Sequence, residues 1–366
     1  MNSLKFFPVL VFLLSFSVIS TGNDNSIPNP EEVLVIMQKT ADWQLIHPWH
    51  NSKLDWEYGA FYSGIWALYK SSGNEKYKEE IRKVGEENNW KLRNDIYHAD
   101  RLTIAQSFAD MYLEEKDPLM LEKIQWVMDM YIDRTAEADV RFEGNPYVFE
   151  WWTWCDALYM APPAFARVYT ATGNIKYLDY LDKHWWLTSD YLYDTTEHLF
   201  YRDDRFFNAR TENGKKVFWS RGNGWVMGGL VRVLQHMPED YPTRPKYITQ
   251  YKEMASKIAA IQGSDGLWRS SLLDAEEFPI GESSGSAFFC YALTWGINQG
   301  LLDKKEYLPV VLKAWYALVN NVDPDGMMGY VQQIGDSPKA ISKTDWQVYG
   351  TGAFLLAGSE ILKLKK

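Results

Sequence analysis

The chain has 366 residues, enough for two or three ordinary domains or for one large domain built from repeats. Its 48 acidic residues outnumber its 38 Lys and Arg residues, and the net charge of −10 argues against a nucleic-acid backbone as the partner. A content of 46% hydrophobic and 23% charged residues is typical of a globular protein and excludes a disordered one.

The first 22 residues are predicted to form a signal peptide. Lys5 supplies the positive end, residues 6–19 form the apolar stretch, and small residues at 20–22 follow it. No Cys follows this stretch to carry a lipid, and no later segment has the length and apolarity needed for membrane insertion. We therefore expect a mature chain of residues 23–366, exported to the periplasm or outside the cell.

An internal repeat organises the rest of the chain. Residues 65–80 (IWALYKSSGNEKYKEE) and 165–181 (FARVYTATGNIKYLDYL) both read as the end of an apolar helix, a short Gly-Asn break and the start of a second amphipathic helix. Looser copies of this joint occur at 111–124, 233–251 and 295–311. Five such joints predict twelve helices arranged as six helical hairpins.

The two helices of each predicted hairpin differ in composition. The first helices are expected near 31–46, 75–89, 118–134, 174–190, 244–262 and 304–321. The second are expected near 57–70, 99–114, 156–171, 222–236, 284–299 and 347–363. Because the second helices are rich in Gly, Ala and apolar residues on all faces, they should form a buried inner ring inside the first. The sequence predicts an all-α (α/α)6 barrel, and no linker favours two half-domains instead.

Uniform joints place the N-termini of all inner helices on one rim, which is where a functional site is expected. Segments with turn signals at 198–203, 264–271 and 324–331 could form small hairpins over that rim. The residues just before the inner helices are rich in aromatic, acidic and small side chains. Those we single out as candidates are Tyr58, His98, Asp100, Trp154, Asp156, Trp219, Arg221, Trp225 and Ser284.

Asp100 and Asp156 are the candidate catalytic residues. Each begins an inner helix, so each could simply cap that helix. Two carboxyl groups in one aromatic cavity are, however, the usual catalytic residues of glycoside hydrolases. Apolar walls can raise the pKa of one carboxyl group while the other stays ionised.

The remaining rim candidates have a structural alternative as well. Arg221, in the Gly-rich WSRGNGW segment, could hold a carboxylate or form an internal salt bridge. Trp219 and Trp225 could stack on a sugar or belong to the core. Ser284 and its neighbouring serines are better placed to cap a helix than to act as nucleophiles.

Signals for metals and cofactors are weak. No HExxH, GxGxxG or GxxxxGK[ST] motif is present, and the pair His47 and His50 lacks an acidic or Cys partner at local spacing. The two cysteines, Cys155 and Cys290, exclude a multi-disulfide scaffold and allow at most one bridge. We expect neither a metal nor a cofactor.

The motifs YHAD (97–100), WWTWCDALYMAPPAFARVY (151–169), EHLFYRD (197–203) and FWSRGNGWVMGGLVRVL (218–234) resemble glycoside hydrolase family 105, the unsaturated rhamnogalacturonyl and related uronyl hydrolases. The resemblance covers most of the mature chain and implies an (α/α)6 barrel. It also implies hydrolysis of unsaturated oligosaccharides, such as pectic lyase products, in which an acid protonates C4 of a C4=C5 double bond and water adds at C5.

By motif position, Asp156 is similar to the general acid/base of that family and Asp100 to its second carboxylate. The resemblance makes Arg221 a substrate contact and places Tyr58, His98, Trp219 and Trp225 around the sugar. Trp154 and Ser284 are further candidate substrate contacts at the rim. Where some relatives carry His-Gly-Trp, this chain has 200–203 FYRD, so Arg202 is expected to supply the missing contact.

Two other readings of the rim remain open. A sugar epimerase on the same barrel would need His residues as acid and base, and only His98 lies at the rim. A carbohydrate-binding protein without activity would use the aromatic rim equally well, but a converging pair of buried Asp residues would then be a needless energetic cost. In either case the partner is a saccharide, and the chain is expected to be a monomer or a weak homo-oligomer.

Overall fold

The structure is a computed structural model that describes residues 26–365, so the predicted signal peptide lies outside the described residues. Within these residues helices alternate between an outer and an inner layer, as the repeat predicts. The outer layer consists of α1 (Pro30–Ile46), α3 (Glu75–Glu87), α5 (Glu122–Ile132), α8 (Lys176–Leu192), α10 (Arg244–Ala260) and α12 (Lys304–Asn320).

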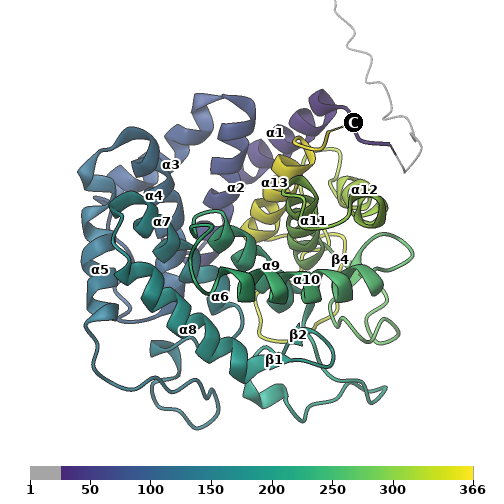
Figure 1. Ribbon diagram of the computed structural model, residues 1–366. Helices are drawn as coiled ribbons and strands as arrows, with labels where there is room; N and C mark the ends of the chain where they lie inside the picture. The colour runs from purple at the N-terminus through teal and green to yellow at the C-terminus, as the bar shows by residue number, and fades with distance from the viewer. Residues whose placement is uncertain (1–25, 366) are drawn as a thin grey trace, which may run out of the picture.

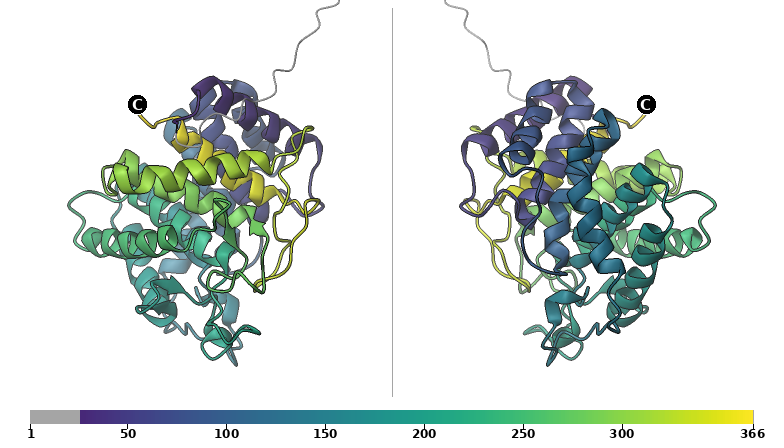
Figure 2. Two further views of the ribbon diagram at one scale, coloured as in Figure 1. Left: turned by 90° about the vertical axis from the view of Figure 1, so that its right-hand side faces the viewer. Right: turned by 90° about the vertical axis from the view of Figure 1, so that its left-hand side faces the viewer.

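The inner layer is made of the helices that follow the outer ones in the chain. It consists of α2 (Trp56–Ser72), α4 (Thr103–Glu115), α6 (Ala157–Met160) with α7 (Pro162–Thr172), α9 (Ser220–Leu234), α11 (Ser283–Asn298) and α13 (Val348–Ile361). Each packs against the next, and α13 packs against α2, which closes the ring (Figure 1). In the two side views of Figure 2 the outer helices lie on the flanks of this ring. The predicted (α/α)6 barrel is confirmed.

The joints between hairpins have the expected helix-ending conformation. Gly73 ends α2 and Gly173 ends α7, each in the left-handed region with φ of 66° and 70°. Glycine adopts this conformation without the penalty that a Cβ imposes, so the chain can stop one helix and begin the next within two residues.

Two inner helices begin less regularly than predicted. The second starts as the 3₁₀ turn η1 (Ala99–Leu102) before α4, and the third is divided at Pro162 into α6 and α7. Proline lacks the N–H that a continuous helix requires, which explains the break. Further 3₁₀ turns are η2 (Pro118–Met120), η3 (Val148–Glu150) and η4 (Asp204–Phe206).

The three predicted hairpins differ in outcome. The first is confirmed, since β1 (Tyr193–Asp194) pairs with β2 (Leu199–Phe200). In the second, β3 (Trp268–Arg269) pairs with β4 (Gly281–Glu282), directly before α11, and so closes a longer loop. The third contains a single bridge between Val322 and Met328.

Close approach of the inner helices depends on their small residues. A Cβ built on Gly64 of α2 would lie 2.4 Å from the carbonyl oxygen of Gly352 in α13, so the two helices can touch only because both residues lack a side chain. Both cysteines, Cys155 and Cys290, are buried and free. Within residues 26–365 no helix has the length and apolarity to cross a bilayer.

Candidate active site

Asp100 and Asp156 lie on the same rim of the barrel, and neither caps a helix with its side chain. Asp100 lies in η1, where the imidazole of His98 provides the cap by accepting from the Asp100 amide at 3.2 Å. Asp156 directly precedes α6, whose start shows no side-chain cap hydrogen bond. Both carboxyl groups therefore remain free for chemistry.

The Asp156 carboxyl group is buried between a thiol and a guanidinium. The residue is 8% exposed, and its Oδ2 accepts from the Cys155 thiol at 3.4 Å. Nε of Arg202 lies 3.8 Å from the same oxygen. Burial raises the pKa of Asp156, and the positive charges of Arg202 and Arg221 act in the opposite direction.

Asp100 is held neutral near pH 7 by its surroundings. Its side chain is 18% exposed. Burial raises the pKa of its carboxyl group to about 8, with Arg93 lowering it and three acidic neighbours, Asp55, Asp156 and Glu57, raising it further. The Asp156 charge thus reaches Asp100, as expected of two groups in one site.

His98 contributes a neutral ring beside Asp100. Its Nδ1 lies 3.8 Å from Oδ2 of Asp100, and burial lowers the pKa of the imidazole to about 4. The ring stacks on Phe149 at a centroid distance of 5.0 Å and meets Trp154 edge-on at 5.4 Å. Since Nδ1 accepts a hydrogen bond, the proton lies on Nε2, which is a donor for a ligand hydroxyl.

Arg202 lies beside Asp156 at the rim. Its Nη1 donates to Asp203 at 2.6 Å, and its guanidinium lies over the rings of Phe142 and Trp154, at 4.9 and 6.0 Å. Its buried Nε has no hydrogen-bond partner within the described residues. Arg202 therefore combines a positive charge near Asp156 with an unused donor.

Arg221 does not lie where a substrate contact requires. It is 1% exposed, and its two terminal nitrogens donate to the carbonyl oxygens of Gln332 (2.5 Å) and Gln333 (3.0 Å). Its guanidinium is also stacked between Trp219 and Tyr349. A buried guanidinium must satisfy its donors, and here backbone carbonyls do so. Arg221 thus anchors the 330–335 loop and acts on Asp156 only through its charge.

Trp219 and Trp225 are buried at the beginning of α9 and offer no open face on which a sugar could stack. Trp225 is fully buried and packs against Tyr159 and Phe288, with centroid distances of 4.8 and 4.5 Å. Trp219 is 2% exposed, and its indole donates to the side chain of Gln332 at 3.0 Å. Both have the core role that the sequence left open as the alternative.

Two further candidates are also engaged internally. The Tyr58 hydroxyl donates to the carbonyl of Trp49 at 2.8 Å, and that of Ser284 donates to Glu282 at 2.6 Å. Ser284 therefore belongs to the capping arrangement at the start of α11, where Glu282 also accepts from backbone amides. Trp154 is buried, and its ring packs edge-on against those of His98 and Phe149.

Sequence reasoning missed two residues of this site, Glu57 and Phe149. Glu57 is 2% exposed, its Oε1 accepts from Asn51 at 2.7 Å, and its Oε2 has no partner among residues 26–365. Burial raises its pKa to about 7. Its position at the start of an inner helix, like that of Asp100 and Asp156, was a usable signal. Phe149, 45% exposed, lies in the short 3₁₀ turn η3, for which the sequence carried no comparable signal.

The described part of the chain holds no group of three or more His, Cys, Asp or Glu side chains suited to a metal ion. The chemistry that the rim offers on its own is proton transfer by buried carboxyl groups, next to a cation and an exposed aromatic ring.

Comparison with known proteins places this arrangement in a family. The sequence model described as Glycosyl Hydrolase Family 88 matches residues 31–365. An unsaturated 3S-rhamnoglycuronyl hydrolase from Formosa agariphila is 42% identical over 349 residues, which cover 92% of each chain. A solved structure of a family 88 glycosyl hydrolase from Bacteroides vulgatus is 30% identical, with a TM-score of 0.83 over 92% of this chain and 99% of that one.

A family 105 glycoside hydrolase from C. acetobutylicum has the same fold, with a TM-score of 0.74 at 20% identity over 90% of this chain and 99% of the other. The resemblance that the sequence motifs indicated is confirmed. The family model that matches the chain is that of family 88, and structures of family 105 share the fold. The fold, the rim chemistry and these similarities together establish that the chain belongs to Glycosyl Hydrolase Family 88 and is a glycoside hydrolase.

Proposed function

We propose that this enzyme releases a 4,5-unsaturated uronate from the non-reducing end of oligosaccharides made by polysaccharide lyases. The sugar next to the uronate is rhamnose, as in the name of the Formosa agariphila relative. One structural observation carries the mechanism: two buried carboxyl groups with raised pKa values share one rim. A raised pKa favours the protonated form of a carboxyl group, which is the form that can deliver a proton.

In this mechanism the protonated Asp156 donates its proton to C4 of the double bond, which leaves an oxocarbenium-like centre at C5. The resulting carboxylate takes a proton from water as the water oxygen bonds to C5. The C5 hemiketal then opens to a ketone, and the hemiacetal left at C1 collapses to release the next sugar. One water is consumed, one glycosidic bond breaks, and Asp156 regains its proton.

The neighbours of Asp156 divide the remaining tasks. Asp100, neutral near pH 7, donates a hydrogen bond to a sugar hydroxyl and orients the ring. Arg202 stabilises the transient Asp156 carboxylate, because its Nε lies 3.8 Å from Oδ2 and has no other partner among the described residues. The exposed ring of Phe149, supported by His98, offers a stacking surface for the leaving sugar.

The first test is the ultraviolet absorbance of the conjugated enoate in a panel of unsaturated disaccharides. The panel pairs the unsaturated uronate with rhamnose, with 3-sulfated rhamnose and with a sugar other than rhamnose. Loss of absorbance with the wild type, and none with Asp156→Asn, supports hydration at the double bond. Cleavage of saturated glycosides with no change in absorbance would refute the mechanism.

Binding of the disaccharides that forms no product and is unaffected by Asp156→Asn would contradict the proposal. Binding alone would not require ionisable carboxyl groups to be buried, which costs free energy.

The proposal extends to the form in which the enzyme works. We propose that residues 1–22 direct export and are removed, and that residues 23–366 act as one domain; the N-terminal sequence of secreted protein tests this. Because all the proposed site residues come from one chain, a monomer or weak homo-oligomer suffices. Activity that requires a stable oligomer in sedimentation experiments would contradict this.

A further inference from the structure

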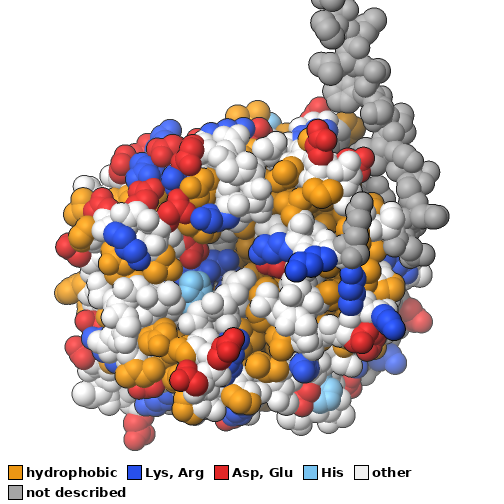
Figure 3. Space-filling view, turned by 45° about the horizontal axis from the view of Figure 1, so that its top comes forward, with side chains coloured by type: hydrophobic (Ala, Val, Ile, Leu, Met, Phe, Trp, Pro, Cys, Tyr) orange, Lys and Arg blue, Asp and Glu red, His pale blue; other side chains and the backbone are white. Residues whose placement is uncertain are grey.

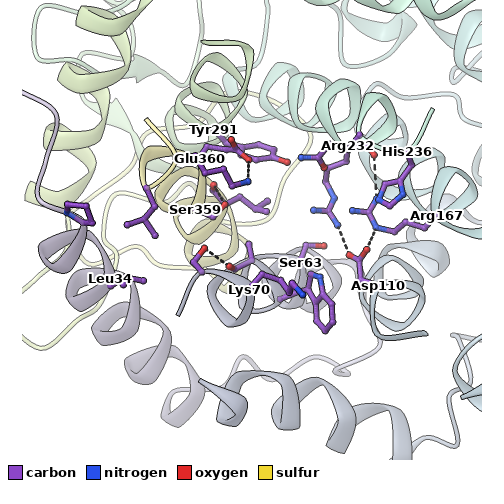
Figure 4. A pocket seen from close by; sticks show the side chains of 18 residues that line it. Leu34, Ser63, Lys70, Asp110, Arg167, Arg232, His236, Tyr291, Ser359 and Glu360 are labelled. Atoms are coloured by element: carbon purple, nitrogen blue, oxygen red, sulfur yellow. Dashed lines mark hydrogen bonds and ion pairs between the residues drawn. The ribbon is translucent and has the colours of Figure 1, made fainter. Parts of the chain in front are cut away.

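A cavity opens at the end of the barrel opposite the active site. It has a volume of about 590 Å³ and is lined by residues from the middle and the C-terminal part of the inner helices, among them Ser63, Asp110, Arg167, Arg232 and Tyr291. Figure 3 shows a hollow on this face with basic side chains gathered at it, and Figure 4 shows the lining residues from close by. Arg221, at the active-site end of α9, is separated from Arg232 by eleven residues, about 16 Å of helix.

Two buried arginines in this cavity share one carboxylate. Nε of Arg167 donates to Asp110 at 2.8 Å, and Nη2 of Arg232 lies 3.7 Å from the other oxygen of Asp110, too far for a hydrogen bond. The side chains of Arg167, Arg232 and Asp110 are 3%, 5% and 8% exposed. One of the two positive charges therefore lacks a counter-charge in a poorly hydrated site.

Donors on these arginines remain unused. Nη2 of Arg232 has no hydrogen-bond partner in the part of the chain that the structure describes, and Nε of the same residue donates to Gln106 at 2.6 Å. Arg167 donates through Nη1 to the carbonyl of Pro163 at 3.0 Å, and none of its hydrogen bonds within residues 26–365 uses Nη2.

The other charged groups of the cavity do not supply the missing negative charge. The carboxylate of Glu360 already accepts from Lys363 at 2.7 Å and from Asn298 at 2.9 Å. Lys70, also in the lining, is paired with Glu114 outside it. His236 carries no positive charge near neutral pH, because burial and then the charges of the two arginines hold its pKa well below the usual range.

The cavity is thus basic in a protein whose net charge is −10: Lys70, Arg167, Arg232 and Lys363 line it against Asp110 and Glu360. We propose that it binds a small oxyanion, a carboxylate or a sulfate group, between the guanidinium groups of Arg167 and Arg232. The planar fork of a guanidinium matches two oxygens of such a group, and burial strengthens the attraction. The proposal does not depend on the function proposed for the other rim.

Calorimetric titration with sodium sulfate and with sodium glucuronate tests the proposal, with sodium chloride and glucose as ligand controls. Two matched variants locate the site, since each removes one arginine charge, one inside the cavity and one at an exposed position outside it. Arg232→Gln should weaken oxyanion binding at least tenfold, whereas Arg141→Gln should leave it unchanged. Binding of both anions indicates a general oxyanion site, and binding of one alone identifies whether the source is a sugar acid or an inorganic ion.

Because Arg232→Gln could impair folding, selenate soaked into crystals of the wild type provides a second measurement. An anomalous peak between Arg167 and Arg232 is expected. Absence of a peak there, absence of saturable heat with both anions, or binding that is retained in Arg232→Gln as fully as in Arg141→Gln would overturn the proposal. Any of these results would leave the two arginines as a purely structural cluster.

Discussion

Replacing Asp100 by Asn should change how stability depends on pH. The carboxyl pKa is 3.8 in an unperturbed Asp and about 8 in the folded protein, chiefly because the side chain is buried. Between these values the folded state binds more protons than the unfolded state, so the wild-type free energy of unfolding falls as pH rises. Asn carries no ionisable proton, and the variant should lack this fall.

The size of the effect follows from the width of that pH window. Each pH unit is worth about 1.4 kcal/mol, so the fall from pH 5 to pH 8 approaches roughly 4 kcal/mol. Since 18% of the Asp100 side chain is exposed and water can relax around the charge, we expect the variant to gain about 2 to 4 kcal/mol over the wild type across this range.

Urea unfolding of both proteins at several pH values from 5 to 9 measures the difference, with Asp240→Asn, at an exposed position, as the control for loss of one charge. The same Asp100 variant should lose roughly 100-fold or more in kcat/KM toward the unsaturated disaccharide. Parallel pH dependence of stability in the wild type and Asp100→Asn would refute the view that burial holds this carboxyl group neutral.

Four further outcomes are expected. Arg202→Ala should raise the pKa of Asp156, so the alkaline limb of the pH–rate profile moves to higher pH while kcat/KM falls roughly tenfold; an unmoved limb would exclude Arg202 from the site. Glu57→Gln should gain about 1 to 3 kcal/mol in urea unfolding at pH 8, because the raised pKa of Glu57, about 7, costs stability above pH 4.5; loss of stability would contradict this. Gly222→Ala would place a Cβ 3.0 Å from Sγ of Cys155 and 3.8 Å from Oδ2 of Asp156. This crowding should lower kcat by about tenfold at a nearly unchanged melting temperature, and full turnover would contradict it. Dialysis against a chelator should leave the rate of enoate loss unchanged if Asp156 and Asp100 act without a metal, and a rate restored only by added metal would refute that.

The helical hairpins could be predicted from the sequence because their signals are local. Gly73 and Gly173 end inner helices in the left-handed conformation that their Gly-Asn joints indicate. The break at Pro162 follows from local chemistry as well, although the periodicity alone suggested one continuous helix. The pairing of β3 with β4 could not be predicted in this way, because it joins segments separated by a long loop.

What the sequence determined by itself is therefore the order of helices, the inner and outer layers, and the rim on which Asp100 and Asp156 would meet. The tertiary structure decided which rim side chains remain available to a ligand. Arg221 and Trp225 belong to a motif that carries the family resemblance, yet packing buries both side chains. The hydrogen-bond partners and the exposure of a rim side chain depend on residues more than a hundred positions away in the sequence, as with Arg221 and Gln332. No local sequence pattern encodes such contacts.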